Sequence, residues 1–295
     1  MTFGIFTKRK NMPVKYLVIT AIALLFSSIT FAQTTAIKYG DNASAGKYAD
    51  IREFKMYYEV YGTGEPLLFI HPNGGSIKSF ENQIEYFSKK YQVILADSRA
   101  QGKSADATDS LSYELMADDF NALLDHLKLK QVYIIGWSDG GINGLLLAMR
   151  HPDKVKKLAA TGANLSPDTT ALHPYVYNDI LQTDKRLLDS MKKSGKAPGV
   201  KNAYKINHMM LAHPHIKPEQ LHKISVPVLI LGGDHEAIPI KHTVLIAESI
   251  PNSYLWIIPA SGHSTPVYQK DWFNGLIDGF FTQPYVKIEG TGRYY

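Results

Sequence analysis

Strand-like and helix-like patterns alternate along this chain from about residue 48, and this alternation restricts its fold more than any other feature. The strand-like runs occupy residues 54–61, 67–71, 93–97, 132–136, 155–161, 228–232 and 254–259. The later runs are continuously apolar, which is typical of strands buried on both faces of a parallel sheet. Between the runs, apolar residues recur at helical spacing, as at Phe80, Ile84 and Phe87. The order predicts an α/β fold, a mostly parallel sheet flanked by helices, with ligands at the carboxyl ends of the strands. Run 54–61 is mixed in polarity and fits an antiparallel edge hairpin.

The alternation stops over about residues 165–225, which contain no clear buried strand. A structureless loop of that length is improbable in a compact domain, so we expect a helical insertion that caps one end of the sheet. Its aromatic, histidine and methionine side chains, such as Tyr204 and Met209, either line a pocket or hold the insertion in place. We expect the domain to cover residues 48–282, after a flexible lead-in (33–47) and before a C-terminal surface extension (283–295).

The positive charge of the chain is concentrated at its N-terminus. The formal net charge is +5, but Lys8, Arg9, Lys10 and Lys15 precede any acidic residue, and without them 28 basic residues face 27 acidic ones. The folded domain therefore gives no support to nucleic-acid binding, which needs a clustered basic face. The chain has no cysteine, which excludes disulfides, thiolate catalysis and cysteine-based metal sites.

An apolar run at residues 16–31 follows these basic residues and ends at a small-x-small site, Thr30-Phe31-Ala32. The run is shorter than the roughly 20 apolar residues that span a bilayer. The pattern predicts a signal peptide over residues 1–32, cleaved after Ala32, and a mature protein that begins at Gln33. The protein would then be exported, periplasmic or secreted, with no stable membrane anchor. The alternative is an uncleaved N-terminal anchor.

The pentapeptide Gly136-Trp137-Ser138-Asp139-Gly140 matches the pattern G-x-S-x-G. It follows a buried strand and precedes the apolar helical run 142–149, which is the context that gives the pattern meaning. A serine on so tight a strand-to-helix turn has a strained backbone, and its hydroxyl is pushed into the cleft. Ser138 is therefore the candidate nucleophile, and Trp137 and Asp139 beside it are expected to bind substrate.

A serine hydroxyl needs a base to take its proton, and His263 is the candidate. It lies in the hexapeptide SGHSTP (261–266), directly after the last predicted strand. An orienting carboxylate should come from the loop after the preceding strand, and that loop offers both Asp234 and Glu236.

A tetrahedral intermediate also needs hydrogen-bond donors for its oxyanion. The backbone N–H of Asp139 is one candidate, and Asn73 in the loop HPNGG is the other, because Pro72 has no N–H. The Asp139 carboxylate, at a helix N-terminus, would favour substrates with a nearby cation, or it only caps the helix. The sequence contains no nucleotide-binding motif, and pairs such as His213 and His215 lack a supporting ligand set, so we expect no cofactor and no metal.

Taken together over about residues 50–282, these motifs resemble the α/β-hydrolase superfamily. HPNGG resembles its oxyanion loop, with Pro72 in place of the usual glycine, and DSRAQGKS (97–104) resembles its D-x-R-G-x-G-x-S stretch, with Ala100 in place of a glycine. GWSDGG resembles its nucleophile elbow, and with the following LLLAMRHPDKVKKLAATGAN it is similar to the biphenyl-hydrolase-like branch of serine esterases. The resemblance implies an α/β-hydrolase fold with a serine nucleophile.

The superfamily pattern at the acid loop resembles G-D-x-D, in which the second acid orients the histidine. The resemblance therefore favours Glu236 as the orienting acid and leaves Asp234 as the alternative. Glu236 lies farther into the loop and has one more methylene of reach, whereas Asp234 is better placed to accept backbone N–H groups.

The sequence thus predicts an exported serine hydrolase that acts on a small-molecule carboxylic ester. Ser138, His263 and Glu236 would work through an acyl-enzyme intermediate without a cofactor. The alternatives are other reactions of the same triad, namely amide or carbon–carbon bond hydrolysis, acyl transfer or perhydrolysis. A catalytically inactive hydrolase fold used for binding is a further alternative. The sequence assigns no oligomeric state.

Overall fold

The computed structural model describes residue 1 and residues 37–106, 108–193 and 198–287. Apart from Met1, the predicted signal peptide lies outside the described residues, as do the start of the lead-in and residues 288–295. Within the described ranges, no helix combines the length and the apolar character that crossing a membrane requires.

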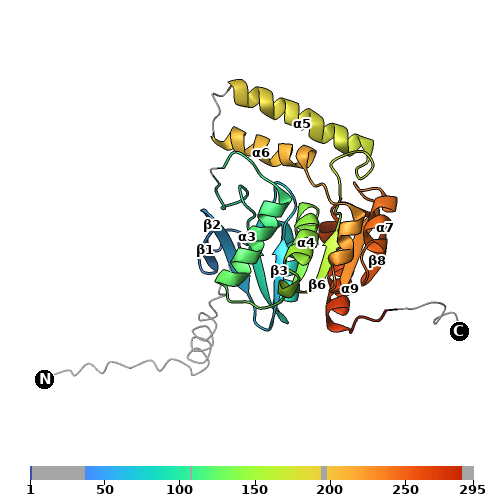
Figure 1. The fold of residues 1–295 in the computed structure, drawn as a ribbon. Coiled ribbons are helices and arrows are strands. Elements are labelled where there is room, and N and C mark those ends of the chain that lie inside the picture. The colour runs from blue at the N-terminus through green and yellow to red at the C-terminus, as the bar shows by residue number, and fades with distance from the viewer. Residues whose placement is uncertain (2–36, 107, 194–197, 288–295) are drawn as a thin grey trace. The chain divides into compact units, whose positions relative to one another are not determined.

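An eight-stranded sheet forms the centre of the domain, in the order β1-β2-β4-β3-β5-β6-β7-β8 (Figure 1). Its strands are β1 (Gly46–Ile51), β2 (Phe54–Tyr61), β3 (Glu65–Ile70), β4 (Tyr91–Ala96), β5 (Val132–Trp137), β6 (Val155–Thr161), β7 (Val228–His235) and β8 (Ser253–Gly262). Strands β3 to β8 pair in parallel, whereas β2 pairs antiparallel with both β1 and β4. The predicted mostly parallel sheet is confirmed.

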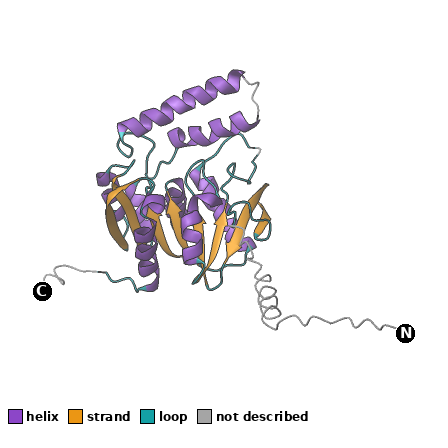
Figure 2. Cartoon of the chain, turned by 180° about the vertical axis from the view of Figure 1, so that it is seen from behind, coloured by secondary structure: helices purple, strands orange, loops and turns teal. Residues whose placement is uncertain are grey.

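Helices cover both faces of the sheet (Figures 1 and 2). The helices of the described residues are η1 (Ile77–Phe80), α2 (Glu81–Phe87), α3 (Tyr113–His126), α4 (Asp139–Arg150), η2 (Pro152–Lys154), α5 (Pro174–Lys193), α6 (Pro198–Ala212), η3 (Pro218–Lys223), α7 (Ile240–Glu248), α8 (Thr265–Tyr268) and α9 (Lys270–Thr282). One apolar core packs α3, α4 and α7 against the sheet, and a second packs α2 and α9 against the other face. Leu68 contributes to the first core, and its neighbours Leu67 and Phe69 contribute to the second. This alternation explains why the central strands are apolar at every position.

Strand β1 lies at the sheet edge and begins inside the segment expected to be a flexible lead-in. The backbone N–H groups of Gly40 and Asn42 donate to the buried Glu59 carboxylate at 2.9 and 3.1 Å. This part of the lead-in is therefore folded against the sheet, and the domain begins before residue 48. The β1–β2 turn places Arg52 and Glu53 at positive φ, without the glycine or asparagine that usually marks such a turn.

The segment between β6 and β7 forms the expected helical cap, with α5 and α6 beyond the carboxyl ends of the strands (Figures 1 and 2). Helix α5 buries only Asp184, whereas α6 buries both the apolar Ile206 and Met209 and the polar Lys205 and Asn207. The cap is therefore attached to the domain mainly through α6, and polar side chains share that contact.

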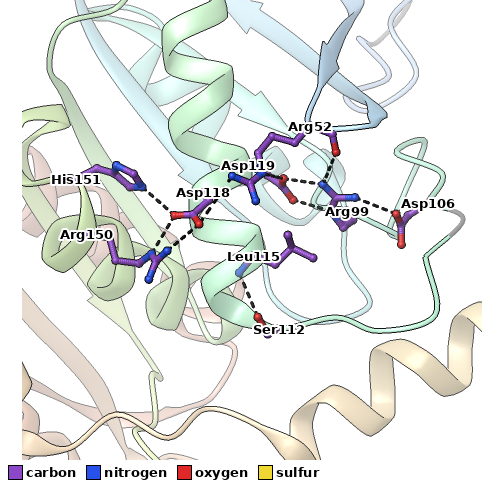
Figure 3. A network of polar contacts seen from close by, with 9 residues as sticks. All are labelled: Arg52, Arg99, Asp106, Ser112, Leu115, Asp118, Asp119, Arg150 and His151. Carbon is purple, nitrogen blue, oxygen red and sulfur yellow. Dashed lines mark hydrogen bonds and ion pairs between the residues drawn. The ribbon is translucent and has the colours of Figure 1, made fainter.

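A buried ion network holds the loop after β4, and Figure 3 shows most of it. The Arg99 guanidinium binds Asp119 of α3 through two bonds of 2.7 Å and Asp106 through one of 3.0 Å. Lys205 of α6 then donates to Asp106 at 2.6 Å. The side chains of Arg99, Asp106, Asp119 and Lys205 are each at most 7% exposed, so the network joins the cap to the sheet in a dry environment. Neighbouring Ala100 has a φ of +67°, a conformation that favours the glycine it replaces.

The described start of the C-terminal extension lies against β8. The Tyr254 hydroxyl donates to the Val286 carbonyl at 3.0 Å and accepts from its N–H at 2.9 Å, and the Tyr285 ring contacts that of Tyr254. Strand β8 is the second edge of the sheet, and it leaves Leu255 and Trp256 about two-fifths exposed.

Candidate active site

Ser138 occupies the turn between β5 and α4, at the centre of the parallel sheet. Its φ of +57° is costly for a residue with a side chain, and the surrounding backbone enforces it. A Cβ atom on Gly136 would lie 2.2 Å from the Gly140 carbonyl oxygen, and one on Gly140 would lie 1.8 Å from that of Ile70. Both flanking glycines are thus required by the close approach of β3, β5 and α4.

A chain of hydrogen bonds runs from Ser138 through His263 to Glu236. The Ser138 hydroxyl lies 2.9 Å from Nε2 of His263, and Nδ1 of the same ring contacts Oε1 of Glu236. That oxygen also accepts the backbone N–H of Ala237 at 2.8 Å. Glu236 is 2% exposed, so its carboxylate is shielded from water. The structure brings these three predicted residues together from the ends of β5, β7 and β8.

Asp234 lies apart from this chain. Its carboxylate accepts the backbone N–H groups of Ala260 and Ser261, both at 3.0 Å, and so ties β7 to the end of β8. These bonds lower the pKa of Asp234. The pairing of β7 with β8 is irregular between Gly233 and His235, and this irregularity accompanies the different placement of the two acids.

Asn73 and Asp139, the two residues predicted to donate to an oxyanion, are bonded to each other. The Asn73 carboxamide donates to the Asp139 carboxylate at 2.7 Å and to the carbonyl of Ile206 in the cap at 3.3 Å. Tyr113 of α3 also bonds the Asp139 carboxylate. Asp139 is the first residue of α4, where a backbone N–H has no acceptor within the helix.

Burial raises the pKa of Asp139 to about 6, although the bonds from Asn73 and Tyr113 and the nearby His263 oppose the shift. For His263, burial acts to lower the pKa of the imidazole, but the bond to Glu236 and the charges of Glu236 and Asp139 outweigh it. The pKa of His263 is therefore raised above its ordinary value of 6.5. The carboxylate of Glu236 favours the charged imidazolium, as an orienting acid should.

Trp137 takes a different position from the one expected. Its indole N–H donates to the backbone carbonyl of His263 at 2.8 Å, and the side chain packs beside Phe80 in the core behind the site. Trp137 is 7% exposed, because alternate side chains of β5 point to opposite faces and this one lies under the histidine loop. In this position Trp137 supports the His263 loop, and a contact with substrate stays a prediction.

Sequence reasoning missed Gly162, which follows β6. It has a φ of +65°, and a Cβ atom there would lie 2.9 Å from Cε1 of His263. Only glycine leaves the imidazole ring its space. A glycine directly after a predicted buried strand was the available signal. Among the described residues, no group of three histidine or acidic side chains could hold a metal ion.

Comparisons with known proteins identify the family of this chain. The chain matches the family model described as alpha/beta hydrolase fold over residues 65–215. It is 26% identical to serine hydrolase BPHL of Homo sapiens over 263 residues, which cover 83% of this chain and 89% of that protein. It is also 26% identical over 251 residues to 3-oxoadipate enol-lactonase 2 of Acinetobacter baylyi, covering 77% and 93% of the two chains.

Among solved structures, the chain is similar to MGS-M2, an α/β-hydrolase enzyme from a Medee basin deep-sea metagenome library. The TM-score is 0.72 with 20% identity, over 83% of this chain and 100% of the other, and this likeness shows the fold. The family match covers half of the chain, and its relatives are hydrolases of the same fold. The chain therefore belongs to the α/β-hydrolase fold family and is a hydrolase similar to the biphenyl-hydrolase-like serine hydrolases.

Proposed function

We propose that the chain hydrolyses a small-molecule carboxylic ester, with Ser138 as nucleophile, His263 as base and Glu236 as orienting acid. The observation that carries this proposal is the hydrogen-bonded chain from the Ser138 hydroxyl through both nitrogens of His263 to the buried Glu236. Nucleophile, base and orienting acid in this order are the requirements of acyl transfer through a serine.

Each step of the reaction follows from that order. Nε2 of His263 accepts the Ser138 proton as the oxygen attacks the carbonyl carbon, and the imidazolium formed is stabilised by Glu236. The imidazolium then protonates the leaving alcohol, and the acyl group remains on Ser138. Water, deprotonated by the same imidazole, attacks the acyl carbon. The imidazolium then returns this proton to the Ser138 oxygen as its bond to the acyl group breaks, and the acid is released. Apart from water, these steps use only side chains of this chain and the ester itself.

The developing oxyanion would be bound by the backbone N–H groups of Asp139 and Asn73. The bond between the Asn73 carboxamide and the Asp139 carboxylate supports this role, because it fixes the loop after β3 relative to the start of α4. Donors held in place before the reaction stabilise developing charge without reorganisation.

The names of the relatives refine the range of substrates to be tested. A lactone is a carboxylic ester closed into a ring, and one relative is named as an enol-lactonase. The substrate panel should therefore contain linear aryl and alkyl esters of varied acyl length together with lactones. Amides, carbon–carbon bond substrates, thioester acyl donors and peroxide as acceptor test the alternative reactions of the same triad.

A fluorophosphonate probe tests the mechanism directly. We expect labelling of the wild type that is abolished in Ser138→Ala, and ester hydrolysis that disappears with it. A folded wild type that neither reacts with the probe nor turns over any ester would contradict the proposal and favour a binding protein. Hydrolysis that survives Ser138→Ala would remove the serine from its assigned role.

We also propose that residues 1–32 direct export and are removed after Ala32. Four basic residues before a short apolar run and a small-x-small site support this. N-terminal sequencing of the protein from cell fractions checks it. A chain that begins at Gln33 in an extracytoplasmic fraction is expected, and retention of Met1 or Met12 would contradict cleavage.

A further inference from the structure

A cavity of about 360 Å³ lies between α6 of the cap and the loops that follow β3 and β4. Asn73 and Gly74 form one wall, residues 100–102 form another, and α6 closes the third. Asn73 is bonded to Asp139, the residue directly after Ser138, so one wall of the cavity contacts the turn that carries the nucleophile. A group bound in the cavity can therefore belong to a substrate whose carbonyl lies at Ser138.

The lining of this cavity is polar but uncharged. Four side chains carry carboxamides, namely Asn73, Gln101, Asn202 and Asn207, and the other lining residues are glycine, alanine and isoleucine. A charged ligand group would find no counter-ion among them, and an apolar group would take water away from four amides without replacing their hydrogen bonds. The lining therefore suits a neutral group that both donates and accepts.

Hydrogen bonds within the protein hold three of these carboxamides in fixed orientations. Gln101 accepts the Gly74 N–H through Oε1 at 2.6 Å, and Asn202 donates to the Ala100 carbonyl through Nδ2. Asn73 uses Nδ2 for its bonds to Asp139 and the cap.

Within the described residues, the opposite ends of the same groups have no hydrogen-bond partner: Nε2 of Gln101 and the Oδ1 atoms of Asn73 and Asn202. The residues that line the cavity thus carry one donor group and two acceptors whose positions are set before a ligand arrives. A hydroxyl or a carboxamide can satisfy both kinds of partner at once. Preorganised groups of this sort distinguish ligands more sharply than flexible ones.

We propose that this cavity selects substrates that carry a neutral hydrogen-bonding substituent, a hydroxyl or a carboxamide, on the acyl or the alcohol part of the ester. The inference rests on the proposed ester hydrolysis at Ser138 and deepens it, because it names the class of ester. Asn202 and Gln101 are the specificity residues, and neither touches the reacting atoms.

Two matched series of esters test the selectivity. In each, a linear chain ends in methyl, hydroxyl, carboxamide, carboxylate or ammonium; the chain belongs to the acyl part in one series and to the alcohol part in the other. We expect kcat/KM for the hydroxyl and carboxamide esters to exceed that for the methyl ester by about tenfold in one series, as one added hydrogen bond allows. The carboxylate and ammonium esters should be poorer than both.

Substitutions in the cap assign the effect to the cavity. Asn202→Leu should remove the preference for hydroxyl over methyl, and Asn202→Asp should shift the preference toward the ammonium ester. Asn178→Leu is the matched control, since Asn178 is an exposed amide on α5 away from the cavity, and its preference should equal that of the wild type. A wild type without any preference, or an Asn202→Leu variant that keeps it, would overturn the inference.

Binding measurements distinguish two outcomes: that the cavity has no selectivity, and that the protein is not an ester hydrolase. Titration calorimetry of Ser138→Ala with the uncleaved hydroxyl and methyl esters measures the cavity without turnover. Hydrolysis of all esters at equal rates would leave the function standing and reject the selectivity. If the wild type cleaves no ester at all, binding decides alone. Tighter binding of the hydroxyl ester than of the methyl ester, lost when Asn202→Leu is added, would support the selectivity of the cavity. Equal affinities for the two esters would reject it.

Discussion

The nucleophile elbow and the cap are held in place by different kinds of contact. At the elbow, backbone packs directly on backbone, so that a single Cβ atom on Gly140 would overlap Ile70. At the cap, α5 buries only Asp184, and α6 is joined to the domain through the apolar side chains of Ile206 and Met209 and through side-chain bonds such as that of Lys205 to Asp106. The comparison teaches that backbone packing within the sheet fixes the position of Ser138, whereas contacts between side chains position the cap above it.

The largest loss of activity is expected from a change in the candidate site at the ends of the strands. Glu236→Gln should lower kcat by about 10⁴-fold, because a neutral amide neither fixes the imidazole tautomer nor stabilises the imidazolium. The side chain is isosteric, so the variant should keep its fold. Steady-state ester hydrolysis measures the loss, and circular dichroism checks the fold.

Asp234→Asn is the matched control for that variant, since it changes the neighbouring acid in the same loop. It should keep a kcat near that of the wild type and lower the melting temperature, because within the described residues the Asp234 side chain bonds the backbone of β8 and not His263. A Glu236→Gln variant with normal kcat beside an inactive Asp234→Asn would reverse the roles of the two acids.

The raised pKa of His263 determines the pH below which kcat/KM of the wild type falls. Below that pKa the imidazole is protonated and cannot accept the Ser138 proton, so kcat/KM should fall as the pH is lowered. Because the nearby carboxylates raise the pKa of His263, the inflection should lie above the ordinary histidine value of 6.5. A profile of kcat/KM against pH that bends at or below that value would contradict the electrostatic description of the site.

Breaking the ion network tests the attachment of the cap. Lys205→Met should destabilise the protein by about 3 kcal/mol, since it removes one of the two buried cations that pair with Asp106 and leaves only Arg99. Lys201→Met, on the same helix, removes an ion pair with the 84% exposed Asp109 and should cost under about 1 kcal/mol. Urea unfolding measures both free energies, and equal losses would show that burial does not distinguish the two pairs.

Asp139 links stability to pH within the site. An acid whose pKa is raised on folding loses stability as the pH rises from its unfolded value of 3.8 to about 6. Asp139→Asn lacks this loss, so its unfolding free energy relative to the wild type should increase by about 2–3 kcal/mol between pH 4 and pH 7. Denaturation of both proteins at the two pH values measures the difference, and a pH-independent difference would mean that burial does not perturb this acid.

The smallest effect is expected on selectivity for cationic substrates. Asp139 is 6% exposed and its carboxylate is already bound by Asn73 and Tyr113, so a substrate ammonium group would have to displace one of them. Asp139→Asn should therefore change kcat/KM for α-amino and plain acyl esters by the same factor, within about twofold. A larger loss on the α-amino esters alone would support the cation-selecting role that the sequence suggested.

Local sequence patterns determined most of the fold and the positions of the candidate nucleophile and base. Buried parallel strands need apolar residues at every position, and the elbow needs Gly136 and Gly140, so both features can be read from neighbouring residues. The same reasoning missed β1, because an edge strand needs no continuous apolar run and its turn uses Arg52 and Glu53 instead of glycine. The first strand is visible only through its pairing with β2.

The tertiary structure decided how the remaining groups are used, because their partners lie far away in the sequence. Asp234 and Glu236 are two residues apart and could both point toward His263 in an extended strand; the irregular β7–β8 pairing gives one to the backbone of β8 and the other to the imidazole. Asn73 meets Asp139 from 66 residues away and Ile206 from 133 residues away. No local pattern encodes such contacts, since they depend on the order of strands in the sheet and on where the cap is attached.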